Sequence, residues 1–319
     1  MTRVITSSVV RSTHKGESHG GVYLVDLQSG EAEQVVDWND ETISWEGRGA
    51  DRGLRGIAFH GDAIYLAASD EIFVFSPDFT IIDSFRNAYL KHCHEITIHG
   101  DTLYLTSTGF DSILLFDLKQ QRFAQGYCLR SLRQPRREWA ARLLGSRTRR
   151  LVPFDPNGSG GPQAADTFHI NSVHVTADGI YLCGTKLAEV LRITPGGALE
   201  TVARVPEGSH NARPYGEHIL PNDTPAHRIA ILERGGTLLE EFPVILYPEQ
   251  DLECANLPKD YARQGWARGL CLTDDGLLGG GSSPATITVY ERGRREPVQR
   301  ITITMDVRNA IHGLEVWPE

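Results

Sequence analysis

The sequence of 319 residues lacks the features that mark membrane and secreted proteins. No apolar run approaches the roughly 20 residues that a membrane-spanning helix needs, and the stretch 1–6 is too short and too polar for a signal peptide. The five cysteines are odd in number and form no C-x-x-C pair, which indicates reduced thiols. We therefore expect a cytoplasmic protein with no membrane partner.

The sequence also lacks an excess of basic residues and several well-known catalytic motifs. The net charge of −9 argues against nucleic acid as a general partner. There is no G-x-S-x-G nucleophile elbow, no phosphate-binding G-x-x-x-x-G-K-[ST] loop and no H-E-x-x-H zinc motif. The enzyme classes built on those three motifs are thereby excluded.

What the sequence does contain is a recurring unit of roughly 40 residues built from short strands. In most copies a short apolar strand leads into a turn with Gly and Asp and then into a second apolar strand. The six copies begin near Arg55, His94, Asn171, Arg213, Arg268 and His312. Such repeats are typical of a β-propeller, in which each repeat forms one four-stranded blade. We predict a single all-β domain over residues 1–319, a six-bladed β-propeller.

Incomplete repeats at the two ends of the chain predict how the ring closes. Residues 2–38 supply three strands, Val4–Val10, Val22–Leu27 and Ala32–Trp38, but no inner strand. Residues 309–317 supply an inner strand without its three partners. We expect the N- and C-terminal strands to share one blade, because this arrangement leaves no open sheet edge.

Two connections are too long for plain turns, and we predict that they form a lid over the axial mouth. The first, about 126–167, has helix-like spacing in 134–144 and carries eight arginines against one glutamate between 126 and 150. A guanidinium group binds carboxylate, phosphate or sulfate through two parallel hydrogen bonds, so Arg136 and Arg137 are candidate substrate-binding residues. The alternative is a solvated helix that docks on the acidic body of the protein. The second connection covers about 247–266.

The superimposed repeats place a polar residue at the start of every inner strand, where the strands converge on the axis. These residues are Arg55, His94, Asn171, Arg268 and His312, with Arg213 in the most degenerate repeat. The residue that follows is glycine in three copies and serine in a fourth, as expected where backbones crowd together. We expect the arginines and the asparagine of this set to bind substrate oxygens or a developing oxyanion.

A second set of histidines aligns two residues upstream, on the same face of an extended strand. It consists of His92, His169 and, with one residue of slack, His210. Three imidazoles with an open coordination position suit a catalytic iron or zinc ion. His94 and His312 would be further ligands or acid–base groups. Glu95 would orient an imidazole or assist catalysis, or would instead form a salt bridge with an arginine of a neighbouring blade. The alternative is that these side chains bind one another and buried water.

The repeat layout resembles six-bladed propellers of the gluconolactonase and regucalcin type. That resemblance implies the fold and an axial divalent metal held by Glu, Asn and Asp, of which Asn171 is the matching type here. The stretches 93–96, 168–173, 209–214 and 267–270 are more similar to an uncharacterised bacterial family of His-rich propeller proteins, which implies the fold. Streptogramin lyase and the four-histidine iron carotenoid oxygenases are more distant analogies of fold.

Together these features predict a metal-dependent enzyme that acts on a small anionic metabolite at the His-rich axial mouth. Hydrolase, lyase and oxygenase chemistry all remain open. The alternative function is a non-catalytic propeller that binds a protein or a ligand through its arginine-rich lid. No oligomeric state is predicted.

Overall fold

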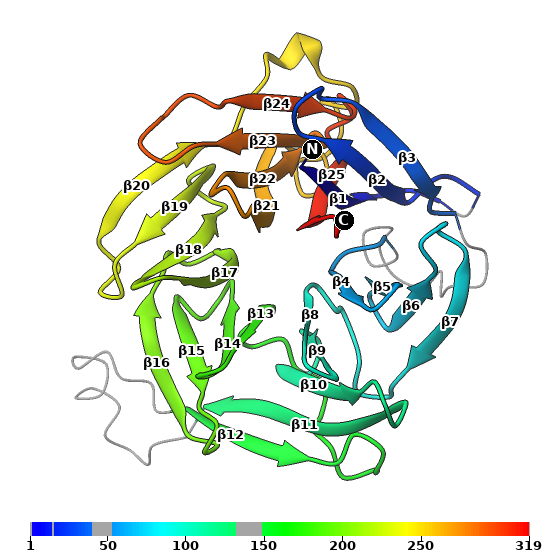
Figure 1. The fold of residues 1–319 in the computed structure, drawn as a ribbon, viewed down its shortest axis with the longest axis vertical. Helices are drawn as coiled ribbons and strands as arrows, with labels where there is room; N and C mark the ends of the chain where they lie inside the picture. Colours follow the sequence, from blue (N-terminus) through cyan, green and yellow to red (C-terminus); the bar gives the residue numbers. More distant parts are fainter. Residues whose placement is uncertain (1, 15, 40–52, 132–148, 319) are drawn as a thin grey trace.

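The computed structural model describes residues 2–14, 16–39, 53–131 and 149–318. These residues form six antiparallel sheets arranged as blades around a central axis (Figure 1). The predicted all-β, six-bladed propeller is confirmed. None of the described segments is a helix long and apolar enough to cross a membrane.

The strands follow the chain blade by blade, each blade running from the axis outward. Blade 1 consists of β25 (Asn309–Val316), β1 (Arg3–Val10), β2 (Gly20–Asp26) and β3 (Ala32–Asp37). Blade 2 consists of β4 (Ile57–His60), β5 (Ala63–Ala68), β6 (Glu71–Phe75) and β7 (Ile81–Arg86). Blade 3 consists of β8 (Ile96–His99), β9 (Thr102–Ser107), β10 (Ser112–Asp117), β11 (Arg122–Ser131) and β12 (Arg149–Phe154).

The remaining three blades have four strands each. Blade 4 consists of β13 (Ile170–Thr176), β14 (Gly179–Gly184), β15 (Glu189–Ile193) and β16 (Leu199–Arg204). Blade 5 consists of β17 (His210–Tyr215), β18 (His218–Asp223), β19 (Arg228–Leu232) and β20 (Leu238–Pro243). Blade 6 consists of β21 (Gly265–Leu272), β22 (Leu278–Ser283), β23 (Thr286–Tyr290) and β24 (Gln299–Thr302).

Blade 1 closes the ring with strands from both ends of the chain, as the incomplete repeats predict. β1 pairs with β2 on one side and with β25 on the other, where Val4 lies opposite Val316 and Val10 opposite Asn309. The buried Thr6 hydroxyl donates to the Gly313 carbonyl at 2.7 Å. Both termini therefore lie at the inner part of blade 1 (Figure 1).

The hydrophobic core is divided into six clusters, one between each pair of neighbouring blades. Between blades 1 and 2, for example, Ile5, Trp38, Leu66 and Phe73 are all buried. Burial of such a side chain stabilises the fold by about 1.5–3 kcal/mol. Because each blade packs on two neighbours, the core holds the inner strands in a fixed register around the axis.

The first predicted insertion differs from expectation, because part of it is strand. β11 continues to Ser131, and Arg149–Phe154 returns as β12, a fifth strand on the outside of blade 3. Arg149 at this strand pairs with Glu189 of blade 4 and thereby ties two blades together. The predicted helix 134–144, with Arg136 and Arg137, lies outside the described residues.

The second insertion links β20 to β21 and contains one turn of 3-10 helix, η2 (Glu249–Asp251). Its middle is anchored on the connection between β24 and β25, because Glu253 donates its backbone N–H to the Met305 carbonyl and its carbonyl accepts the Val307 N–H. Its first part is anchored by Tyr247, whose hydroxyl lies 2.8 Å from the Thr302 hydroxyl. The segment that follows leads into β21 beside the axis.

Candidate functional site

Each blade contributes one polar residue to the end of the axial channel at which the inner strands begin. These six residues, which we call the mouth ring, are Arg55, His94, Asn171, His210, Arg268 and His312. In every blade the residue two positions further along is a buried aliphatic residue, namely Ile57, Ile96, Val173, Ala212, Leu270 or Leu314. The shared pattern places the six polar residues at one level of the channel.

His210 belongs to the mouth ring and is not the counterpart of His92 and His169, so the predicted alignment needs correction in blade 5. The Nδ1 atom of His210 lies 3.0 Å from the carbonyl oxygen of Gly208, two residues earlier. The Nδ1 atom of His94 lies 2.7 Å from the carbonyl oxygen of His92, also two residues earlier. Gly208 therefore takes the place of His92, and the leading residue of this repeat is His210.

Arg213 lies three residues past the mouth ring and faces the other end of the channel. It pairs with Leu220 in the register in which Thr97 pairs with Tyr104. Its guanidinium lies 3.6 Å from the Glu315 carboxylate, and it donates to the Leu270 carbonyl. The structure thus separates Arg213 from Arg55 and Arg268, with which the sequence groups it.

Hydrogen bonds fix the tautomers of three histidines near the mouth. A carbonyl or carboxylate oxygen only accepts, so the Nδ1 atoms of His94 and His210 carry the proton. The same holds for His169, whose Nδ1 lies 3.0 Å from an Asp166 carboxylate oxygen. In each neutral ring the lone pair is therefore on Nε2. The Nε2 atom of His210 is buried and has no partner.

The mouth environment keeps these imidazoles neutral. Burial lowers the pKa of His94, His210 and His312 well below the ordinary value, and the positive charge of nearby arginines lowers it further. Burial also lowers the pKa of His169, although Asp166 opposes that effect. At neutral pH these rings are therefore uncharged, and the Nε2 atoms of His94, His169 and His210 can accept a hydrogen bond without first losing a proton.

His94 lies close to His169 and to His312, but these three rings are not all free to bind a common ligand. The ring centroids of His94 and His169 are 5.2 Å apart, and those of His94 and His312 are 6.5 Å apart. The Nε2 atom of His312 is already engaged by an Arg268 guanidinium nitrogen at 3.1 Å. Within residues 2–14, 16–39, 53–131 and 149–318, no group of three or more His, Cys, Asp or Glu residues is arranged to hold a metal ion.

Three arginines surround one indole beside the mouth ring. The guanidinium carbons of Arg11, Arg263 and Arg268 lie 3.3, 4.1 and 4.9 Å from the centre of the Trp266 ring. Burial lowers the pKa of Arg268 to about 9, and repulsion from Arg55 and Arg263 contributes. Among the described residues, no carboxylate forms an ion pair with any of these three arginines. The cluster is therefore a concentration of positive charge without a counter-charge from this part of the chain.

Sequence reasoning missed Arg11, Arg263 and Trp266. For Trp266 a signal was present, because it stands two residues before Arg268, as His92 stands before His94 and His169 before Asn171. All three upstream residues adopt positive φ, which marks them as equivalent: 54° at His92, 53° at His169 and 51° at Trp266. Arg11 follows β1 in another part of the chain, and only the fold brings it to Trp266.

The other predicted binding residues are deeply buried. Arg55 and Asn171 have 3% and 2% of their surface exposed. The Arg55 side chain donates to the Cys93 carbonyl of the next blade at 3.5 Å, and Asn171 donates to Ser209 at 3.4 Å. The amide oxygen of Asn171 has no partner. Both residues join neighbouring blades at the level of the mouth ring.

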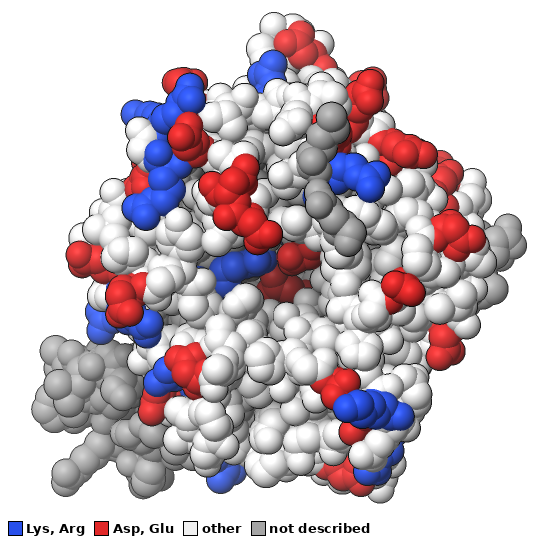
Figure 2. All heavy atoms as spheres, in the orientation of Figure 1, with Lys and Arg blue, Asp and Glu red and all other residues white. Residues whose placement is uncertain are grey.

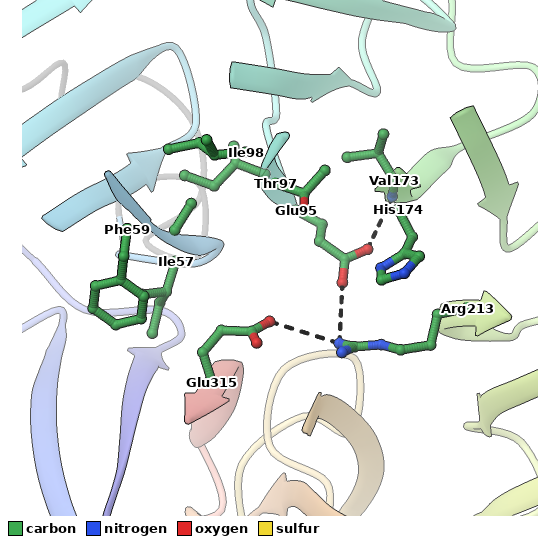
Figure 3. A pocket seen from close by; sticks show the side chains of 11 residues that line it. Ile57, Phe59, Glu95, Thr97, Ile98, Val173, His174, Arg213 and Glu315 are labelled. Carbon is green, nitrogen blue, oxygen red and sulfur yellow. Dashed lines mark hydrogen bonds and ion pairs between the residues drawn. The ribbon is translucent and has the colours of Figure 1, made fainter. Parts of the chain in front are cut away.

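Glu95 faces away from the histidines that it was expected to orient. Its carboxylate accepts the Val173 backbone N–H at 3.0 Å and the Asn211 side-chain amide at 3.2 Å. Together with Arg213 and Glu315 it lines a cavity of about 200 Å³ at the other end of the channel (Figure 3). On that face, acidic and basic atoms lie side by side in the central hollow (Figure 2).

Replacement of Glu315 by glutamine should stabilise the protein at alkaline pH. Burial raises the pKa of Glu315 to about 7 from its ordinary 4.5, and Arg213 only partly opposes this. The folded protein thus favours the protonated acid, so ionisation costs stability as the pH rises from about 4.5 through 7. Because 34% of the side chain is exposed, we expect solvent screening to limit the loss to about 1 kcal/mol.

Thermal melts at pH 5.5 and pH 8.5 test this expectation. The melting temperature of Glu315→Gln should drop less between the two pH values than that of the wild type. The exposed Glu296→Gln should behave as the wild type does. Equal pH dependence in the wild type and in Glu315→Gln would show that Glu315 ionises normally in the folded protein.

Comparisons with known proteins bear on the fold. No protein-family model and no curated protein matches the chain. Among solved structures, a protein of unknown function from Bacteroides caccae is 10% identical with a TM-score of 0.58, over 100% of this chain and 99% of that one. A candidate 6-phosphogluconolactonase from Bacteroides fragilis is 12% identical with a TM-score of 0.58, over 99% of this chain and 98% of that one.

A further match, to a streptogramin B lyase structure, covers 76% of this chain and 70% of that one at 14% identity and a TM-score of 0.45. That score is too low to carry an argument. The two full-length matches share the overall fold of this chain along its whole length. At 10% and 12% identity, what they establish for this chain is the propeller fold.

Proposed function

We propose that this protein is an enzyme that binds a small anionic molecule at the mouth ring and acts on it by acid–base chemistry. The observation that carries the proposal is the arginine cluster around Trp266, for which the described residues supply no counter-charge. Arg11 is buried and Arg268 is half-buried, whereas Arg263 is exposed. Buried positive charge is costly unless it is paired. An anion in the mouth would supply that pairing through charge-assisted hydrogen bonds.

The neutral histidines would supply the chemistry. His94 is held on both sides of its Nδ1 atom, by the His92 carbonyl at 2.7 Å and by the Thr108 hydroxyl at 2.9 Å. This support orients Nε2 and keeps it as a proton acceptor, the requirement for a general base. His312 is hydrogen-bonded to Arg268, so it would act together with the guanidinium that binds the anion.

Removal of the Arg268 charge should weaken anion binding without loss of the fold. We expect Arg268→Met to bind inorganic phosphate about tenfold or more weakly in titration calorimetry, because a hydrogen bond to a charged group contributes about 1.5–3 kcal/mol. The melting temperature should not fall much, since the substitution relieves repulsion among arginines. The exposed Arg294, which pairs with Glu291, provides the control Arg294→Met. Equal phosphate affinity in both variants would contradict the proposal.

A bound iron or zinc ion is a second candidate element of the function. In its favour, His94, His169 and His210 each donate Nδ1–H to an oxygen and leave Nε2 open, and metal-binding histidines commonly donate their other ring N–H in this way. Against it, the described residues form no three-ligand group. Such an ion would supply Lewis-acid polarisation of a bound carbonyl or water. The anion-binding proposal does not depend on it.

Elemental analysis of untagged protein tests the metal candidate. If the site exists, near-stoichiometric iron or zinc should be present and should be lost in His169→Ala and in His210→Ala. His92 and His94 both precede β8, so His92→Ala and His94→Ala then show which of the two is a ligand of the metal ion. His60→Ala and His99→Ala, at the far ends of inner strands, are the controls. Protein free of transition metal, with no gain in stability on adding iron or zinc, would reject this element.

A further inference from the structure

A side pocket opens next to the mouth ring between blade 5 and the second insertion. It has a volume of about 680 Å³, within the range of small-molecule sites. Blade 5 contributes its loop residues Thr224, Pro225 and His227, and the insertion contributes Lys259, Arg263 and Gln264. His210 and Arg268 of the mouth ring form its inner wall, so the pocket is continuous with the proposed anion site.

Unpartnered polar atoms gather in this pocket. His210, His227, Trp266 and Arg268 all line it, and their atoms Nε2, Nδ1, Nε1 and Nε, respectively, are buried and have no hydrogen-bond partner. The His210 side chain is the most deeply buried of them, with 6% exposure. Folded proteins pair the great majority of buried polar groups. Several unpaired groups around one cavity therefore indicate that something polar occupies it.

The chemistry of these atoms restricts the occupant. The indole Nε1–H and the guanidinium Nε–H only donate, so they require acceptors on the ligand. His210 Nε2 carries a lone pair, because its Nδ1–H is donated to Gly208, so it requires a donor on the ligand. The charged residues in the lining, Lys259, Arg263 and Arg268, are all cationic, which favours an anion.

The walls add an apolar requirement. Pro225 lies against Gly208 at the base of β17, and Trp266, whose ring is covered by the Arg11 and Arg263 guanidinium groups, forms part of the opposite side. A Cβ atom added at Gly265 would lie 2.2 Å from the Nδ1 atom of His227. The two sides of the pocket therefore approach each other closely at this glycine. The proline ring favours contact with an apolar body over a fully hydrated ion, and the planar guanidinium groups of Arg263 and Arg268 favour a flat one, because guanidinium planes stack on aromatic faces.

We propose that the side pocket binds a small carboxylate that has an apolar planar body and a hydroxyl group. The carboxylate would pair with Arg263 and Arg268, and the hydroxyl would donate to His210 Nε2. The inference rests on the proposed anion-binding function and adds the substrate class to it. It also assigns His210 as the residue that distinguishes hydroxylated ligands from their unsubstituted analogues.

A matched ligand series tests the substrate class by titration calorimetry. The probes are benzoate and its 2-, 3- and 4-hydroxy derivatives. At least one hydroxybenzoate should bind wild-type protein about tenfold more tightly than benzoate, the worth of one buried hydrogen bond. His210→Phe, which keeps a ring without the acceptor, should remove that preference and leave benzoate binding in place. Trp266→Phe, which removes the indole N–H, should weaken all four probes.

The outcomes separate this inference from the proposed function. Benzoate binding without any hydroxyl preference would overturn the substrate class and leave the anion site standing. Phosphate binding without binding of any aromatic probe would do the same, and a crystal structure would then show the unpaired atoms bound to water. Failure of phosphate and of all four carboxylates to bind would overturn the proposed function itself. If His210→Phe fails to fold, the wild-type ligand series still decides.

Discussion

Deletion of residues 309–319 is expected to leave a protein that does not fold to a soluble monomer. The deletion removes β25, and with it the whole ladder that covers the inner edge of β1. It also removes Ile311 and Leu314 from the cluster between blades 6 and 1, and His312 from the mouth ring. An exposed inner edge is a template for pairing with other chains. We therefore expect inclusion bodies or soluble aggregates on size-exclusion chromatography.

Removal of 318–319 alone is the matched control for that deletion. It spares β25 and the hydrogen bond from the Trp317 N–H to the Arg3 carbonyl. This shorter truncation should remain monomeric with a nearly unchanged melting temperature. A monomeric 1–308 protein with wild-type melting behaviour would show that the ring does not depend on closure by β25.

Replacement of Gly313 by alanine should destabilise the protein more than any of the substitutions named above. A Cβ at this position would lie 2.2 Å from the Arg55 carbonyl oxygen and 2.8 Å from an Ile57 side-chain carbon. The first of these is backbone of the next blade and cannot rotate away, so two inner strands would have to move apart. Overpacking usually costs 1–3 kcal/mol, and here we expect about 3 kcal/mol or more.

Denaturant unfolding with a matched glycine measures this effect. Gly235→Ala introduces the same methyl group where no atom lies within 4 Å, so its effect should stay within about 0.5 kcal/mol. Gly313→Ala should lower the midpoint strongly or prevent folding. A midpoint close to that of Gly235→Ala would mean that the inner strands of blades 1 and 2 are less crowded than the structure has them.

The fold was predictable because its signals repeat. Six copies of one strand–turn–strand pattern give the blade count, and the incomplete copies at the ends give the closure. The glycine after the leading polar residue could also be explained. A Cβ atom added at Gly56 or at Gly313 would lie less than 3 Å from a backbone atom of the neighbouring blade. Each of these features depends on local sequence and on the geometry common to all propellers.

The site was harder to predict because it depends on register and on distant segments. In blade 5 the sequence 209–213 allows either His210 or Arg213 to lead, and a shift of register changes which side chains face the mouth. The hydrogen bonds from His210 to Gly208 and Thr224 show that His210, and not Arg213, is the residue of blade 5 that faces the mouth. Glu95 of blade 3 accepts a hydrogen bond from Asn211 of blade 5, a contact between residues 116 positions apart that the sequence alone does not reveal.

A crystal structure grown in selenate tests the central claim most directly. Selenate is an oxyanion like sulfate, and its selenium atom can be located by anomalous scattering. An anomalous peak is expected beside Arg11 and Arg268, within hydrogen-bond distance of a guanidinium. Peaks at exposed arginines, with none at the mouth ring, would contradict the claim that this mouth binds small anions.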